Sequence, residues 1–142
     1  LSAFTRRREA MANEATLYIE TEPPIPMTIH KDLAVEKGTL LVMIDPFSVS
    51  KHASAGQAIA GIAAEEHIAS VGKTEIAVYR RGFFKITVSS SILAGNSWLA
   101  SATANKIQGA NATDQHYGGT AFETAANDET LFVELAPFNI SQ

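Results

Sequence analysis

The chain has 142 residues, no cysteine, 46% hydrophobic residues and 18% charged residues. That length fits one domain with its own core, and the lack of cysteine excludes disulfide scaffolds, thiolate metal sites and cysteine nucleophiles. Eleven Lys and Arg against fifteen Asp and Glu give a net charge of −4, which argues against a general nucleic-acid coat. The sequence has no apolar run of about 18 residues that could cross a membrane as a helix.

The first 28 residues are predicted to form an extended N-terminal arm outside the globular body. Residues 16–20 can form one short strand with Leu17 and Ile19 on one face. Three of the four residues 23–26 are prolines, which remove backbone donors and favour an extended path. A disordered tail is the alternative. Met11 resembles an ordinary start, so residues 1–10 are expected to be an upstream extension, an expression remnant or a tail left by processing.

The body, residues 29–142, carries the signals of β-strands. Residues 39–44 and 58–63 are short apolar runs, each typical of a buried strand. Between residues 75 and 88 five apolar residues alternate, and all are even-numbered on both sides of Gly82: Ile76, Val78, Phe84, Ile86 and Val88. This constant parity favours one long strand with a distortion at Gly82 over two strands in different sheets, with a tight hairpin as an alternative.

The C-terminal half continues the β pattern, and signals for helices are weak. Residues 130–135 alternate again, and Pro137 is expected to stop that strand. Residues 63–70 are good helix formers, enough for about two turns, and residues 89–94 could form one more turn. The stretch 105–120 is rich in Ala, Asn, Thr and Gly and is expected to be loop. We therefore predict an all-β or β-dominated domain, a barrel or sandwich with one or two short helices.

No catalytic or metal-binding motif stands out. The four histidines are dispersed, and no nucleophile elbow, phosphate-binding loop or calcium loop is present. The densest polar cluster, Glu65-Glu66-His67, is most simply a solvated helix face. The basic run Arg6-Arg7-Arg8 could contact phosphates but is more typical of a solubilising tail. We therefore expect no enzymatic activity, metal, cofactor or nucleic-acid partner.

The aromatic residues point to an interface. Phe83 should point opposite to Phe84 on its strand, and Phe132 opposite to its two neighbours. A sheet with large apolar groups on both faces must cover both, either with a second sheet or loops of its own or with another subunit. Trp98, the only tryptophan, is either a core residue or an interface anchor.

The order of motifs along the body carries a resemblance. The motifs are Val-Glu-Lys-Gly-Thr-Leu-Leu (35–41), Gly-Gln-Ala-Ile-Ala-Gly-Ile-Ala-Ala (56–64), Ile-Ala-Val-Tyr-Arg-Arg-Gly-Phe-Phe-Lys-Ile (76–86), Ala94-Gly95, Asn-Lys-Ile (105–107), Gly-Thr-Ala-Phe-Glu-Thr-Ala (119–125) and Glu-Thr-Leu-Phe-Val-Glu-Leu (129–135). Their order and spacing over residues 33–135 resemble the small head decoration, or capsid cement, proteins of tailed bacteriophages. Each motif alone is unspecific.

The resemblance implies a compact β-tulip-like body with an N-terminal arm. It implies a structural, non-enzymatic protein that binds the outside of the expanded capsid as a homotrimer and clamps neighbouring subunits of the major capsid protein. It also implies a place on the outer surface of the virion, no cofactor, and no nucleic-acid or membrane partner. The family has no counterpart to residues 1–10.

The candidate binding residues follow from the implied arm and from the aromatic pattern. The arm, residues 16–30, would add to a strand of the capsid shell, through the residues Leu17, Tyr18, Ile19, Pro23, Pro24, Ile25, Pro26 and Ile29. The candidates for the interface between subunits are Arg80, Arg81, Phe83, Trp98 and Phe132.

Two other functions remain open. Residues 35–41 are similar to a turn of biotinyl and lipoyl carrier domains, so a carrier-type or ligand-binding β domain is one alternative, although the attachment lysine of those carriers is absent. A small hydrolase with a dispersed triad is the other. It would need a polar pocket that joins a serine to His52, His67 or His116.

Overall fold

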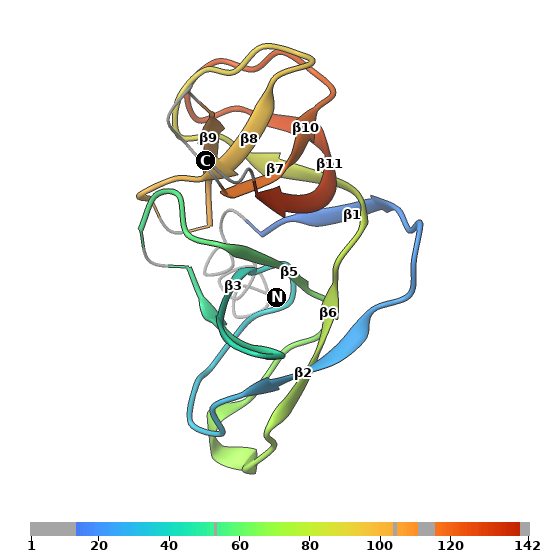
Figure 1. The fold of residues 1–142 in the computed structure, drawn as a ribbon, viewed down its shortest axis with the longest axis vertical. Coiled ribbons are helices and arrows are strands. Elements are labelled where there is room, and N and C mark those ends of the chain that lie inside the picture. Colours follow the sequence, from blue (N-terminus) through green and yellow to red (C-terminus); the bar gives the residue numbers. More distant parts are fainter. Residues whose placement is uncertain (1–13, 53, 104, 111–115, 140–142) are drawn as a thin grey trace, which may run out of the picture.

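The fold is that of a computed structural model, and the residues described are 14–52, 54–103, 105–110 and 116–139. It consists of a closed five-stranded barrel, with strand order β2-β4-β3-β5-β6, and a six-stranded sheet, with order β1-β7-β11-β10-β8-β9 (Figure 1). The predicted β-dominated fold is thereby confirmed. The barrel strands are β2 (Ile25–Ile29), β3 (Leu40–Asp45), β4 (Ser48–Lys51), β5 (Ile59–Ala63) and β6 (Glu75–Tyr79). The sheet strands are β1 (Thr16–Ile19), β7 (Gly82–Thr87), β8 (Ser97–Ala100), β9 (Ile107–Gly109), β10 (His116–Ala121) and β11 (Thr130–Asn139).

The described part of the N-terminal segment belongs to the body, which differs from the predicted free arm. Strand β1 pairs with β7 at the edge of the sheet, and β2 pairs with β6 and β4 in the barrel. Met27 and Ile29 are buried in the barrel core. Pro26 is tolerated in β2 because its register partner Ala77 makes its backbone hydrogen bonds with other residues. The Ala77 amide donates to the Glu65 carboxylate, and the Ala77 carbonyl accepts from the Ala64 amide.

The single strand predicted across Gly82 is wrong, because β6 and β7 belong to different sheets. The chain leaves the barrel after Tyr79 and enters the six-stranded sheet at Gly82, where φ is 149°. The predicted parity nevertheless holds: Ile76 lies in the barrel core and Phe84 in the sheet core. An extended chain keeps its alternation while its neighbours change, so parity alone does not reveal a change of sheet.

The predicted helices are also wrong. Residues 63–70 contain the end of β5 and a bridge between His67 and Val35, and only Ala69–Val71 forms a short 3-10 helix, η1. Their amides are used in long-range pairs, so tertiary contacts override the local helix propensity. In residues 89–94, Ile92 exchanges two backbone hydrogen bonds with Ala125. Over the described part of the chain, no helix is long and apolar enough to span a membrane.

The stretch expected to be loop contains β9 and β10. Gly118 lies in β10 where the ring of Trp98 occupies the space that a side chain would need, so this glycine marks close packing in place of a turn. Strand β11 continues beyond Pro137. The register of β10 and β11 shifts between Tyr117 and Gly119, and β7 begins opposite Leu135, so Pro137 lies beyond the β7 pairing and has no ladder hydrogen bond to supply.

The structure has two hydrophobic cores, one inside the barrel and one between the sheet and the barrel strands β3 and β5. The barrel encloses Met27, Ile29, Val35, Leu41, Val49, Ala60, Ala63, Ile76 and Val78. The inner face of the sheet packs around Trp98 together with Phe84, Ile86, Leu131, Val133 and Leu135. The two cores leave the opposite face of the sheet and the ends of the barrel free for other contacts.

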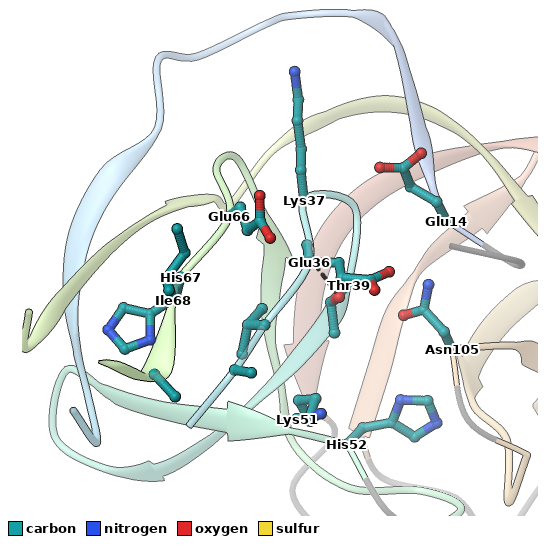
Figure 2. A pocket seen from close by; sticks show the side chains of 13 residues that line it. Glu14, Glu36, Lys37, Thr39, Lys51, His52, Glu66, His67, Ile68 and Asn105 are labelled. Carbon is teal, nitrogen blue, oxygen red and sulfur yellow. Dashed lines mark hydrogen bonds between the residues drawn. The ribbon is translucent and has the colours of Figure 1, made fainter. Parts of the chain in front are cut away.

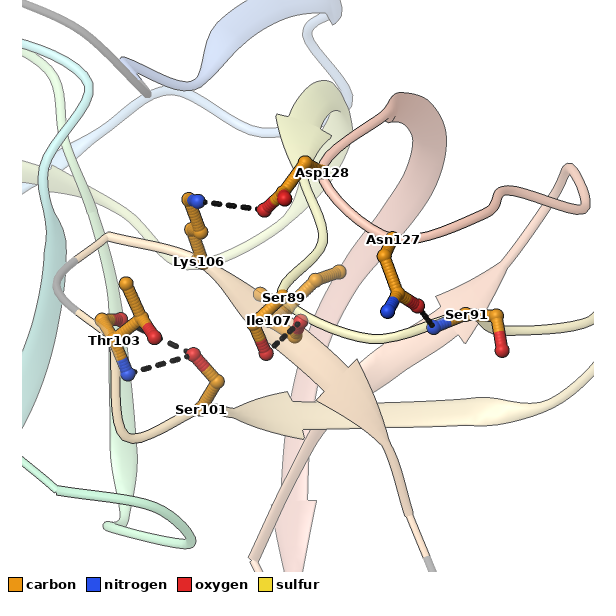
Figure 3. A network of polar contacts seen from close by, with 8 residues as sticks. All are labelled: Ser89, Ser91, Ser101, Thr103, Lys106, Ile107, Asn127 and Asp128. Atoms are coloured by element: carbon orange, nitrogen blue, oxygen red, sulfur yellow. Dashed lines mark hydrogen bonds and ion pairs between the residues drawn. The ribbon is translucent and has the colours of Figure 1, made fainter.

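Loops beside the sheet are held by short polar contacts (Figure 3). The Ser101 hydroxyl donates to the Thr103 carbonyl and accepts from the Thr103 amide, both at 3.1 Å. The Ser91 amide donates to the Asn127 side chain at 2.7 Å. Side chains thus satisfy main-chain groups that have no strand partner, which fixes these loops without helices.

Candidate interaction surfaces

The outer face of the six-stranded sheet carries a cluster of aromatic rings. Tyr18 and Phe132 lie with ring centroids 4.6 Å apart, and Phe83 meets Phe122 edge to face at 5.1 Å. We call these four residues the aromatic face. The Lys85 ammonium lies 5.2 Å from the centre of the Phe132 ring, within cation–π range.

Strand pleating explains why the rings gather there. Lys85 is the register partner of Phe132, and Phe83 is the register partner of Glu134. The side chains of these two pairs therefore lie on the same face of the sheet, opposite the core around Trp98. Tyr18 is 64% exposed and Phe122 is 53% exposed. Clustered exposed aromatic rings are typical of surfaces that bind another protein.

One end of the barrel forms a second apolar surface. There β2, β4 and β5 begin and β3 and β6 end, as their pairings require. A cavity of about 280 Å³ opens at this end, which we call the barrel mouth, and its lining residues are Ile25, Met27, Met43, Pro46, Phe47 and Arg80. Phe47 is 67% exposed at the β3–β4 turn. A neighbouring cavity shares Met43 and Arg80 and extends the mouth toward Phe138.

Arg80 is the charged residue of the mouth. Its Nη1 donates to the Ala60 carbonyl at 2.6 Å, which orients the guanidinium across the end of the barrel. Burial lowers the pKa of Arg80, the positive charge of Arg81 lowers it further, and Glu22 opposes both. The mouth therefore holds a cation that has lost part of its hydration.

A third cavity, of about 430 Å³, lies near the opposite end of the barrel (Figure 2). Its lining includes His52 and His67, which are two of the three histidines that could serve as the base of the alternative hydrolase. His67 is buried, with Nδ1 2.6 Å from the Leu33 carbonyl and Nε2 2.6 Å from the Lys73 carbonyl. Nε2 of His52 lies 3.1 Å from the Ser101 carbonyl. These ring nitrogens therefore hold loops together through backbone oxygens, and the described contacts join neither ring to a serine hydroxyl.

Among residues 14–52, 54–103, 105–110 and 116–139, no three His, Asp or Glu side chains gather as a cation site would require. The three carboxylates at the cavity of Figure 2, those of Glu14, Glu36 and Glu66, share its lining with Lys37 and Lys51. The cavity is thus lined by charges of both signs.

The structure separates the predicted arm residues. Tyr18 and Ile19 are exposed on β1, and Leu17 packs partly against the sheet core. Pro23 and Pro24 lie in the connection between β1 and β2. Three of the candidates fall within β2 itself, where Ile25 lines the barrel mouth, Pro26 pairs with Ala77 and Ile29 is 2% exposed. Ile29 is therefore a core residue in this fold.

The predicted interface residues fall into three places. Phe83 and Phe132 lie on the aromatic face, and Arg80 lines the barrel mouth with Arg81 exposed beside it. Trp98 is 0% exposed and its Nε1 donates to the Glu134 carbonyl at 3.1 Å, so it is a core residue and not available to another subunit. The basic run at residues 6–8 lies outside the described residues.

Sequence reasoning missed two important residues. Phe122 follows the end of β10, and its exposure could have been suspected from the polar residues Glu123 and Thr124 that follow it. Phe47 sits at a turn with φ of 55°, and the preceding Asp45-Pro46 was the available turn signal. Aromatic residues at turn tips are a useful sign of contact surfaces.

Comparison with known proteins leaves the fold as the shared property. No protein-family model matches the chain, and no curated protein matches it. Among solved structures, the chain is similar to the crystal structure of the head fiber gp8.5 N base in bacteriophage phi29. The two chains are 15% identical, the match covers 83% of this chain and 97% of that chain, and the TM-score is 0.53. At that identity, the likeness shows a common fold.

Proposed function

We propose that this chain is a structural protein of a tailed-phage head. The observation that supports it best is the shared fold with the head fiber base, which extends over 83% of this chain and nearly all of that one. The order of sequence motifs resembles phage head decoration proteins independently of that comparison. Exposed apolar surfaces on both halves suit a protein that works by binding other proteins.

We further propose that the chain binds the outside of the expanded capsid as a homotrimer and clamps neighbouring major capsid subunits. Strand β1 is an edge strand of the six-stranded sheet, so its outer side offers backbone groups to a strand of the capsid. Ile19, 47% exposed on that strand, is a side chain available for such a contact. Three linked copies would multiply a weak individual contact through their effective concentration.

Size-exclusion chromatography with light scattering, run with and without expanded phage heads, tests this function. We expect a trimer of about three times 15.2 kDa, or a monomer that binds expanded heads to saturation. Unexpanded heads serve as the control surface. A protein that is monomeric in solution and does not bind expanded phage heads would refute the proposal.

A pair of matched variants tests the capsid contact. Ile19→Lys places a charge on the β1 edge and should lower head occupancy while leaving the mass in solution unchanged. Val71→Lys changes a 66% exposed side chain on η1 and should leave occupancy unchanged. Equal occupancy for both variants would argue against docking through β1.

A further inference from the structure

We propose that the aromatic face of one copy packs into the barrel mouth of the next copy, and that three such contacts close the ring. The inference rests on the trimer of the proposed function. In a cyclic trimer, each subunit meets its two neighbours through two different surfaces. A single self-complementary patch gives a dimer, so a trimer requires a second, matching surface on every copy.

The two surfaces are complementary in shape. On the aromatic face, Tyr18 and Phe122 are more than half exposed, so their rings are accessible to a concave partner. The barrel mouth is concave, with a cavity of about 280 Å³ between apolar side chains. The floor of that cavity is Met27, which is 3% exposed, and Phe47 stands at its rim. A ring from the aromatic face can therefore enter the mouth and bury apolar area on both partners.

The two surfaces are also complementary in charge. Arg80 is the one charged residue among those that line the mouth, and its Nη1 is already bonded to a backbone carbonyl. The aromatic face offers Glu134, the register partner of Phe83, together with the negative faces of the rings. A guanidinium is well satisfied by both a carboxylate and an aromatic ring.

The partial burial of the Arg80 guanidinium in the single chain supports this pairing. Burial lowers the pKa of this guanidinium before the effect of neighbouring charges is counted. A partly desolvated cation gains from an acidic or aromatic partner more than a fully hydrated one does. Lys85, the cation on the aromatic face, is already placed over the Phe132 ring, so it does not leave an uncompensated like charge at the contact.

Two blocked variants test the pairing, because a copy blocked at the face and a copy blocked at the mouth should still form one contact with each other. Tyr18→Lys/Phe122→Lys blocks the face and leaves the mouth intact, whereas Phe47→Lys blocks the mouth and leaves the face intact. All three side chains are more than half exposed, so folding should be retained, as a thermal melt would verify. Leu93→Lys, at a 62% exposed loop position, is the matched control.

We expect each blocked variant alone to be monomeric, with association weakened by about 100-fold or more, and the control to be trimeric. A 1:1 mixture of the two variants retains one intact face and one intact mouth. It should therefore form a pair of about twice 15.2 kDa that cannot close into a ring. Where trimers form only on phage heads, the same samples are crosslinked on the heads and the subunits are counted on a denaturing gel.

The possible failures are distinguishable. A Phe47→Lys variant that stays trimeric overturns the role of the mouth while leaving the proposed function intact, and it would point to the mouth as a capsid contact. Monomeric variants whose mixture also stays monomeric overturn the pairing of these two surfaces. If Phe47→Lys fails to fold, Ile25→Lys at the same mouth replaces it. Wild-type protein that is monomeric and ignores heads overturns the proposed function itself.

Discussion

Gly118→Ala is expected to destabilise the protein by about 3 kcal/mol. An added Cβ would lie 2.6 Å from Cε3 of Trp98 and closer still to Cζ3 and Cη2. The ring is wholly buried, and its Nε1 is held by the Glu134 carbonyl, so it cannot move without losing that bond. Overpacking costs about 1–3 kcal/mol and a lost hydrogen bond about 1 kcal/mol. For a chain of this length, that corresponds to a fall in Tm of about 6–12 °C.

Urea unfolding at one fixed protein concentration measures the effect, with Gly109→Ala as the matched control. Gly109 is in β9, has no strained φ, and its added Cβ would meet Ile92 at an ordinary 3.6 Å, so its change should stay within about 0.5 kcal/mol. Trp98→Phe should cost about 2 kcal/mol alone and should be partly compensated by Gly118→Ala, which fills the vacated space. The reasoning is refuted if Gly118→Ala behaves like the control, or if the double variant is as unstable as the sum.

Three other predictions concern groups away from that contact. Burial, followed by the charge and hydrogen bond of Glu20, raises the pKa of Tyr79 above 10.0. The stability from its protonated hydroxyl is therefore complete below about pH 10 and is lost as the pH rises through the raised pKa, so Tyr79→Phe should flatten the alkaline limb of a stability–pH curve. His67→Leu should cost about 1–3 kcal/mol in urea unfolding, because the part-buried carbonyls of Leu33 and Lys73 lose the imidazole that lies between them; a neutral effect would contradict this. Lys106→Met should cost less than about 1 kcal/mol in urea unfolding, and the cost should shrink as salt is added, since the partner carboxylate of Asp128 is 72% exposed and therefore screened.

Short-range patterns predicted the strands well where burial alternates. The parity of residues 76–88 correctly gave Phe83 and Phe84 opposite faces, and with them the location of the aromatic face. The apolar runs 39–44 and 58–63 correctly predicted strands β3 and β5. Strand β5 is buried throughout as expected, whereas β3 is buried only over its first three residues and exposed from Met43 on. The helix predicted at residues 63–70 failed because long-range backbone pairs outweigh the propensity of an Ala- and Glu-rich segment.

The candidate site was only partly predictable for a related reason. From the sequence Trp98 suits a core and an interface equally, and only its complete burial in the folded chain, with Gly118 against its ring, decides for the core. The barrel mouth brings Ile25, Phe47 and Arg80 together from three distant parts of the chain. Their proximity depends on closure of the barrel, which no local pattern encodes.

The passage of two paired segments from the barrel into the sheet has a mechanical consequence. Residues 16–29 pair with residues 75–87 in both halves, first as β1 with β7 and then as β2 with β6. The halves are thus joined by two paired segments, whose connections 20–24 and 80–81 lie between the pairs Ile19–Phe83 and Ile25–Val78, and by the core that the barrel strands β3 and β5 share with the sheet. Because the paired segments and a close-packed core both cross between the halves, a load applied to the sheet is transmitted to the barrel without changing the angle at which the aromatic face and the barrel mouth are presented.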